Sequence, residues 1–287
     1  MYMGMEGQSI RIRKRRITDE IGKGIMYLSV LFSVCLAAGI TGYVLWKGAA
    51  VIDWQFLTGV TSVLRGTTGI AGNIINTLYM VAVTLAITTP IGVGAAIYLN
   101  EYAVPGRLVQ LIEFTTEVLA GIPSIIFGLF GMVFFGSTLG LGYSILTGAL
   151  TLTVMILPLI IRNTQEALKA VPASYRMGAL GLGAAKWYMV RTILLPAARP
   201  GIVTGIILAV GRIVGESAAL LFTAGSSGLL PARGSGLLEK IFTSGGTMTI
   251  QLYLSMSKAD DETAFGIGAV LLLLVLLLNS LARAWSR

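Results

Sequence analysis

Six apolar stretches, each long enough to cross a lipid bilayer, recur along this chain and leave little room for any other architecture. An α-helix rises about 1.5 Å per residue, so about 20 apolar residues cross a hydrocarbon core of about 30 Å. The six stretches therefore predict an all-α integral membrane protein. Its single transmembrane domain covers residues 24–284, between a basic N-terminus (1–23) and a short tail (285–287). The stretches are residues 24–46, 70–97, 109–135, 143–161, 201–224 and 264–281.

Charged residues are scarce, and so are histidine and cysteine, the residues that most often bind metals or carry redox chemistry. Charged residues form 12% of the chain, about half the share found in soluble domains. Histidine is absent, and the single cysteine, Cys35, cannot form an internal disulfide, so neither catalytic nor metal-binding residues are assigned. The net charge of +8 does not indicate nucleic acid as a partner, because the positive residues flank the apolar stretches as they do in membrane proteins.

The distribution of lysine and arginine predicts the orientation in the membrane. With six spans and the N-terminus inside, 15 of the 21 basic residues lie in cytoplasmic segments, five lie in outer segments and one, Arg212, lies within a span. The positive-inside rule therefore predicts that both termini are cytoplasmic. The basic loop 162–199, between the fourth and fifth spans, is then cytoplasmic, and the loop 225–263 is external. This outer loop is either a simple loop or a docking site for an external binding protein. Part of it could form a short helix that lies in the membrane interface.

Two opposite charges interrupt the fifth span. Arg212 lies eleven residues after Gly201 and therefore near the middle of the membrane, where a charged side chain costs at least about 2.5–3.5 kcal/mol unless it faces a partner or water. Glu216 follows four residues later, on the same face of a continuous helix. Two hypotheses are open: an ion pair that only fixes packing, or a substrate pathway in which Arg212 contacts an anion and Glu216 orients it.

A second acidic pair lies near the cytoplasmic start of the third span. Glu113 and Glu117 are also four residues apart, about 6 and 12 Å from the start of their helix. They either reach the interface or pair with loop arginines, because charges near a span's end can escape toward water. Otherwise they line the inner mouth of a pathway or form an ion pair between helices.

Glycine spacing predicts helix contacts along the fifth span. Gly201 and Gly205 form one small-xxx-small pattern, and Gly211 and Gly215 form another. Such patterns let neighbouring membrane helices approach closely. A neighbouring helix is therefore expected on this face.

The basic loop predicts two short helices broken around Gly181 and Gly183, with Pro172 ending an earlier helical piece. Apolar residues beside basic ones favour an amphipathic element that fits a groove on a partner. A solvated basic loop at the inner leaflet has the same composition. Composition alone does not choose between these two hypotheses.

A motif in this loop resembles a known family. Gly183, nine further residues and Ile193-Leu194-Leu195-Pro196 resemble the G-x9-I-x-L-P half of the EAA loop of ABC transporter permeases. In that family the loop's coupling helix docks onto the ATPase subunit. The family's Glu-Ala-Ala falls on Met177, Gly178 and Ala179 here, so its acidic residue is missing. The resemblance assigns the coupling loop to Met177, Gly178, Ala179, Gly183, Ile193, Leu195 and Pro196.

Longer segments between about Gly72 and Ala224 resemble PstA-type permeases of bacterial phosphate importers. They include QEALKAVPASYR, GALGLGAAKW, LLPAARPGIVTG and GRIVGESAALLFTAG. The resemblance implies a multi-pass subunit of the bacterial or archaeal cytoplasmic membrane that imports inorganic phosphate. It also implies a PstC-type second permease, a PstB-type ATPase dimer on the cytoplasmic side and a PstS-type phosphate-binding protein outside.

The chain has no nucleotide-binding signature of its own. Gly178 and Gly183 have the glycine spacing of a P-loop, but Ala184 and Ala185 follow where lysine and a hydroxyl residue are needed. The chain is therefore expected to be a non-catalytic subunit without a bound cofactor, with ATP used by a partner. Two alternatives stay open: an ion-coupled secondary anion carrier, and a membrane scaffold that does not transport.

Overall fold

The computed structural model describes residues 3–62, 67–230 and 237–286, and describes side chains for 19–61, 68–230 and 239–284. Arg65, Arg233 and Arg287, which entered the predicted orientation, lie outside the described residues, as do the side chains of the basic stretch 11–16. The described elements are helices apart from one antiparallel hairpin, in which Val60 pairs with Ile70. The all-α prediction is confirmed.

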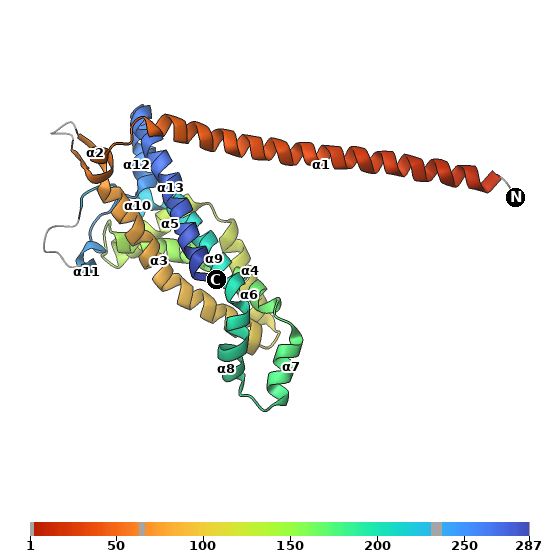
Figure 1. Cartoon of the computed structure of the whole chain (residues 1–287). Coiled ribbons are helices and arrows are strands. Elements are labelled where there is room, and N and C mark those ends of the chain that lie inside the picture. Colours follow the sequence, from red (N-terminus) through yellow and green to blue (C-terminus); the bar gives the residue numbers. More distant parts are fainter. Residues whose placement is uncertain (1–2, 63–66, 231–236, 287) are drawn as a thin grey trace.

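The elements follow one another in the order shown by the colours of Figure 1. The first half contains α1 (Met3–Ala49), α2 (Trp54–Thr58), β1 (Val60–Ser62), β2 (Thr67–Ile70), α3 (Ala71–Ile97), the π-helical η2 (Tyr98–Tyr102), α4 (Arg107–Gly121), α5 (Ser124–Gly131) and η3 (Met132–Thr138). The second half contains α6 (Ile145–Lys169), α7 (Ala173–Gly181), α8 (Lys186–Met189), η4 (Val190–Leu194), α9 (Leu195–Gly215), α10 (Ala218–Thr223), α11 (Leu237–Lys240), α12 (Met248–Ser257) and α13 (Asp261–Ser286).

Helix α6 forms the centre of the bundle. It packs against α3 on one side and α9 on another, and two thirds of its most apolar stretch is buried (67%), the largest share among the spans. Its side chains Leu152 and Ile156 meet Met80 of α3 and Ile213 of α9 in the main hydrophobic core. The short helices α7 and α8 project from one end of this bundle, and the hairpin lies at the other (Figure 1).

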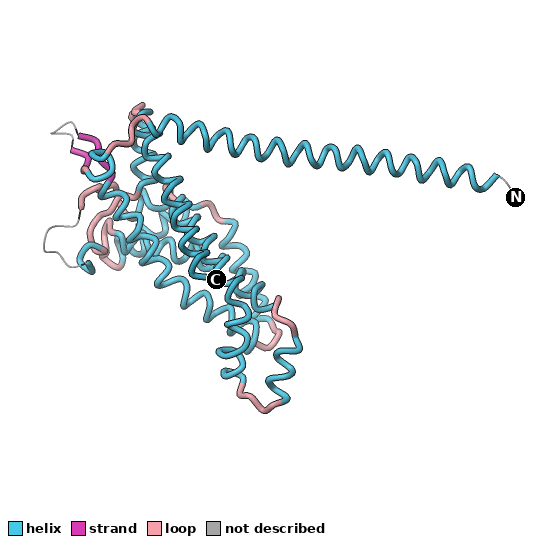
Figure 2. The backbone as a smooth tube through the Cα atoms, in the orientation of Figure 1, coloured by secondary structure: helices cyan, strands magenta, loops and turns pink. Residues whose placement is uncertain are grey.

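Helix α1 projects away from the bundle (Figures 1 and 2). Only its C-terminal end packs on α13, where the rings of Tyr43 and Phe265 meet edge to face and the Lys47 Nζ lies 5.8 Å from the centre of the Phe265 ring. The predicted span 24–46 falls within this helix, and none of the most apolar stretch of residues 19–49 is buried by the rest of the chain. This apolar surface is left for lipid or another subunit.

The third predicted span, 109–135, is wrong as one continuous helix. It consists of α4 and α5 with η3, which meet at a bend of 102°. Pro123 lacks an N–H and disfavours a helical conformation at the residue before it, and Ile122 accordingly adopts an extended backbone (ψ 132°). Among the described residues, five helices are long and apolar enough to cross a membrane, or six if this bent pair is one span, so the orientation and the count of six stay predictions.

The fifth predicted span, 201–224, is also broken. Helix α9 ends at Gly215, Glu216 is extended (φ −80°, ψ 126°), and α10 begins two residues later. The break satisfies its own polar groups, because the Glu216 carboxylate accepts the N–H of Ala219 at 3.1 Å and the Glu216 carbonyl accepts the hydroxyl of Thr249 at 2.8 Å. Backbone breaks at membrane depth require such partners.

The basic loop is shorter than the predicted 162–199, because helices extend into it from both sides. Helix α6 continues to Lys169, and α9 begins at Leu195 instead of Gly201. The expected pair of short helices is confirmed: α7 and α8 are separated by a turn in which Gly183 has a φ of 77°.

The segment 225–263, predicted to be external and called the outer segment below, packs into the bundle with its described residues and is not a peripheral loop there. Helix α12 packs on α13 and α3, and its Met248 and Ile250 are buried. Asn73 and Asn76 of α3 hold this segment by donating to the carbonyl oxygen of Gly246 at 2.9 and 3.2 Å, and Asn76 also donates to the Ser227 carbonyl at 3.0 Å. We call Asn73 and Asn76 the outer latch.

Lys240 anchors another part of the outer segment. Its side chain is buried and its Nζ donates to the carbonyl oxygen of Leu229 at 3.0 Å. Burial lowers the pKa of Lys240 from 10.5 because it disfavours the charged form. The folded state therefore gains stability as pH rises from the lowered pKa toward 10.5, where the unfolded chain loses the same proton.

Replacing Asn76 with leucine is expected to loosen the outer segment. The change removes the two hydrogen bonds that Asn76 donates to the Ser227 and Gly246 carbonyls, at about 0.5–1.5 kcal/mol each. Hydrogen exchange of residues 237–257 measures the effect and should rise. The matched control is Asn279→Leu, since the Asn279 side-chain oxygen is buried without a partner among the described residues; this change should leave the segment protected. Equal exchange in both variants would contradict the latch.

Candidate functional site

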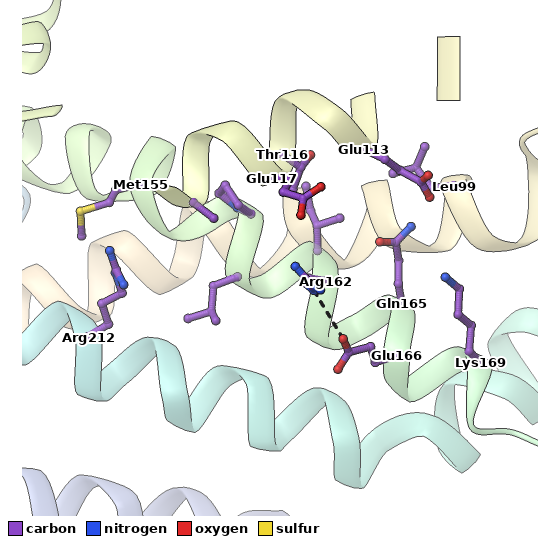
Figure 3. A pocket seen from close by; sticks show the side chains of 14 residues that line it. Leu99, Glu113, Thr116, Glu117, Met155, Arg162, Gln165, Glu166, Lys169 and Arg212 are labelled. Atoms are coloured by element: carbon purple, nitrogen blue, oxygen red, sulfur yellow. Dashed lines mark ion pairs between the residues drawn. The ribbon is translucent and has the colours of Figure 1, made fainter. Parts of the chain in front are cut away.

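A cavity of about 480 Å³ lies between α4, α6 and α9 (Figure 3). It follows α6 from Met155 to Lys169, about 21 Å along the helix axis. Lys169 is the last residue of α6, next to the basic loop, whereas Met155 lies in the main core. The cavity therefore runs from the loop end of the bundle toward its middle.

Arg212 projects from α9 into the end of this cavity nearest the middle of the bundle, beside Met155 (Figure 3). We call this end the inner end of the cavity. Within the part of the chain that the structure describes, no ion pair or hydrogen bond engages its guanidinium group. Arg212 lies in the last turn of α9, where the unsatisfied carbonyl groups carry partial negative charge. The helix end thus favours the cation without occupying its donors, which stay available to an anion.

Glu216 does not serve as the partner of Arg212. The two residues were expected on one face of a continuous helix, but the helix ends between them and the Glu216 carboxylate binds the Ala219 N–H. Glu216 is also absent from the residues that line the cavity. The expectation of an Arg212–Glu216 ion pair within one helix is wrong, and its physical reason is the break after Gly215.

The acidic pair of α4 lines the same cavity. Glu113 and Glu117 are exposed on α4 and face α6 across the space (Figure 3). On the α6 side, Arg162 and Glu166 form an exposed ion pair with an N–O distance of 3.5 Å. Charges of both signs therefore line the half of the cavity nearer the loop, and Arg212 provides the positive charge at the inner end.

The residues assigned to the coupling loop divide into a buried and an exposed set. Ala179 is buried and packs in a small core with Leu168, Met189 and Leu194. Met177 and Gly178 face outward on α7, while Ile193, Leu195 and Pro196 lie where η4 passes into α9. The loop thus joins the bundle through its own hydrophobic core.

The outward side of α7 and α8 carries large apolar side chains, which we call the loop surface. Leu182, at the turn, is 91% exposed. Such a concentration of exposed apolar residues on a projecting element indicates a protein contact. The loop surface consists of Tyr175, Met177, Leu180, Leu182, Trp187 and Tyr188.

One contact was not predicted from the sequence. Arg176 of α7 forms an ion pair with Glu101 of η2, with an N–O distance of 2.9 Å, and the Glu101 side chain is only 5% exposed. The two residues lie 75 positions apart, and Glu101 lies between the predicted spans 70–97 and 109–135. An acidic residue between two spans, on the side predicted to carry most basic residues, was the available signal.

Replacing Gly183 with alanine is expected to weaken the function of the loop surface. The positive φ of 77° at Gly183 disfavours any side chain, although no atom lies within 4 Å of an added Cβ. Strain of about 1–3 kcal/mol would shift the turn between α7 and α8. Co-purification with the ATPase subunit that the EAA-loop resemblance implies measures the result and should decrease several-fold. The same change at Gly181, which also has open space but ends a helix, should have no effect; equal losses would contradict the argument.

Comparisons with known proteins identify a family and several relatives. A family model described as "Binding-protein-dependent transport system inner membrane component" matches residues 88–287. The probable ABC transporter permease protein YqgI of Bacillus subtilis (strain 168) is 39% identical, and the match covers 74% of this chain and 72% of YqgI. The phosphate transport system permease protein PstA of Haemophilus influenzae is 34% identical (78% and 79% covered), and that of Pasteurella multocida is 31% identical (94% of both).

Solved structures share the fold. A bacterial alginate ABC transporter, in complex with an alginate-bound periplasmic protein, superposes with a TM-score of 0.69 at 15% identity, covering 96% of this chain and 97% of the matched chain. An inward-facing MetNI methionine ABC transporter superposes with a TM-score of 0.57 at 19% identity, covering 78% and 94%. At these identities the likeness concerns the fold.

Proposed function

Because the chain belongs to the family of binding-protein-dependent transport system inner membrane components, we propose that it is the membrane subunit of an ATP-driven importer of inorganic phosphate. It is a multi-pass protein of the bacterial inner membrane. The proposal of phosphate rests on PstA relatives that cover most of the chain at 31–34% identity.

The placement of Arg212 is the observation that supports an anionic substrate. Its guanidinium group lies at the inner end of a cavity without a protein partner among the described residues. Guanidinium offers planar paired donors that match phosphate oxygens and stays charged at every relevant pH. Glu113 and Glu117, nearer the loop, would lower the affinity of that half of the cavity for an anion, so that the anion is not retained there.

The proposal includes partners for the other steps. A second permease of the PstC type would complete the pathway, a PstB-type ATPase dimer would bind the loop surface, and a PstS-type protein would deliver phosphate from outside. This chain would be non-catalytic and would bind no cofactor, and ATP would be used by the ATPase subunit. The large exposed side chains of the loop surface, such as Leu182 and Trp187, support a protein partner there.

Reconstitution in proteoliposomes tests this proposal. Uptake of labelled phosphate that requires ATP, the ATPase and the second permease is the expected result. Uptake by this chain alone under an ion gradient would instead indicate a secondary carrier. A chain that binds the ATPase but never supports uptake would indicate a scaffold, and either of these outcomes overturns the proposal.

A further inference from the structure

We propose that helix α3 carries the movement of the ATPase-contacting loop to the outer segment, and that Glu101 and Arg176 are the positioning residues that attach α3 to the loop. This inference rests on the proposed function, since it concerns how ATP-driven movement crosses the bundle. The covalent route from the loop runs through α9. The contacts described below define a second, non-covalent route.

The first attachment is a buried ion pair at the loop end of α3. The π-helical segment η2 continues directly from α3 and carries Glu101. One oxygen of Glu101 accepts from Nε and Nη2 of Arg176 at 3.2 and 2.9 Å. The same guanidinium donates to the carbonyl oxygens of Leu168 and Val171 at 2.8 and 3.0 Å. Arg176 thus joins α7, the end of α6 and the end of α3 in one hydrogen-bonded unit.

Two further contacts attach the same segment to the loop. Lys186 of α8 lies 5.0 Å from the ring centre of Tyr102, the last residue of η2. Ile97, the last residue of α3, packs in the small core formed by Ala179, Met189 and Leu194. Because α7 and α8 both contact η2, displacement of either helix displaces the end of α3.

The opposite end of α3 holds the outer segment. Helix α3 has 27 residues and is continuous despite Pro90, so it extends about 40 Å. The outer latch, Asn73 and Asn76, lies in its first turns and binds the Gly246 carbonyl. Thr77, one residue further, accepts the N–H of Met248, the first residue of α12. A continuous helix therefore has the loop attached at one end and the outer segment at the other.

The test separates attachment from transport itself. In proteoliposomes containing the complete transporter, Glu101→Gln is expected to lower phosphate uptake per ATP hydrolysed about five- to tenfold, the size of a typical coupling between sites. ATPase co-purification should be unchanged, because the loop surface is intact. Glu262→Gln is the matched control: this exposed carboxylate at the start of α13 has no described partner, and uptake per ATP should stay at the parental value.

A covalent link tests whether restoring the lost attachment also restores coupling. In a Cys35→Ser background, the pair Glu101→Cys and Arg176→Cys should show the same low uptake per ATP. Linking the two thiols with a short bismaleimide should restore the parental uptake per ATP, because η2 and α7 then move together again. Tyr102→Leu, which leaves the ion pair in place, should cause a smaller loss and serves if Glu101→Gln fails to assemble.

The outcomes distinguish this inference from the proposed function. If the parental transporter shows no ATP-driven phosphate uptake, the proposed function fails. If the parental transporter works and Glu101→Gln or Tyr102→Leu keeps its uptake per ATP, attachment of α3 to the loop is irrelevant to coupling. Blocked transport in the cross-linked pair would also overturn the inference, because it would mean that the two elements separate during each cycle.

Discussion

Replacing Arg212 with glutamine is expected to reduce ATP-driven phosphate uptake at least tenfold. The loss of a charge-assisted hydrogen bond costs about 1.5–3 kcal/mol, which corresponds to a factor of about 10 to 150. Arg212 has no described protein partner, so its charge is available to the anion and its removal leaves no other ionic group unpaired. Uptake of labelled phosphate by reconstituted transporter measures the effect.

Two companion measurements make this prediction specific. Arg212→Lys keeps the charge but loses the planar pair of donors, so its uptake should fall between the parental protein and Arg212→Gln. Assembly with the ATPase should survive in both variants, because Arg212 lines the cavity and is not part of the loop surface. Parental uptake by Arg212→Gln would refute the anion contact.

Replacing Gly128 with valine is expected to prevent stable assembly of the subunit. Gly128 of α5 packs against the backbone of Ala219 in α10, and an added Cβ would lie 2.8 Å from the Ala219 Cα. Backbone atoms cannot move aside as a side-chain end can, so the cost should reach or exceed about 3 kcal/mol. Thermal unfolding of the detergent-solubilised subunit measures this effect as a lower transition temperature.

The matched control lies in the same bent pair of helices. Gly121 ends α4, and no described atom lies within 4 Å of an added Cβ. Gly121→Val should therefore unfold close to the parental temperature. Similar unfolding of both variants and the parental subunit would show that the close approach of α5 and α10 is not required.

Continuous spans and local glycine contacts could be predicted from the sequence. Helix α3 begins and ends within one residue of the predicted 70–97, because its apolar run is long and is bounded by a strand and a polar link. The contact expected at Gly201 and Gly205 is confirmed: added Cβ atoms would lie 2.5 and 2.7 Å from the Cβ atoms of Ala167 and Asn163 in α6. Both features depend on residues close together in the sequence.

The second glycine pattern illustrates the limit of such local rules. Gly211 and Gly215 have the same spacing, but no described atom lies within 4 Å of a Cβ added at either position. The helix ends at Gly215, so these two residues lie next to the break and not along a helix contact. Spacing alone therefore does not show which face of a helix is covered.

The breaks and the Glu101–Arg176 pair depend on partners that are distant in the sequence. The extended backbone at Glu216 is satisfied by Thr249, 33 residues later, and the Arg176 guanidinium finds Glu101, 75 residues earlier. Apolar periodicity continues through Glu216 and predicts an unbroken helix. Only the folded arrangement shows that other groups satisfy the freed backbone and the buried charge.

Protection of the cavity by phosphate tests the central claim most directly. A single cysteine at Leu159, which lines the cavity one turn from Met155, can be placed in a Cys35→Ser chain and exposed to a charged thiol reagent. Phosphate, but not chloride, should slow modification of this cysteine in the assembled transporter, and the protection should disappear in Arg212→Gln. Modification at the same rate with and without phosphate would contradict an anion site at Arg212.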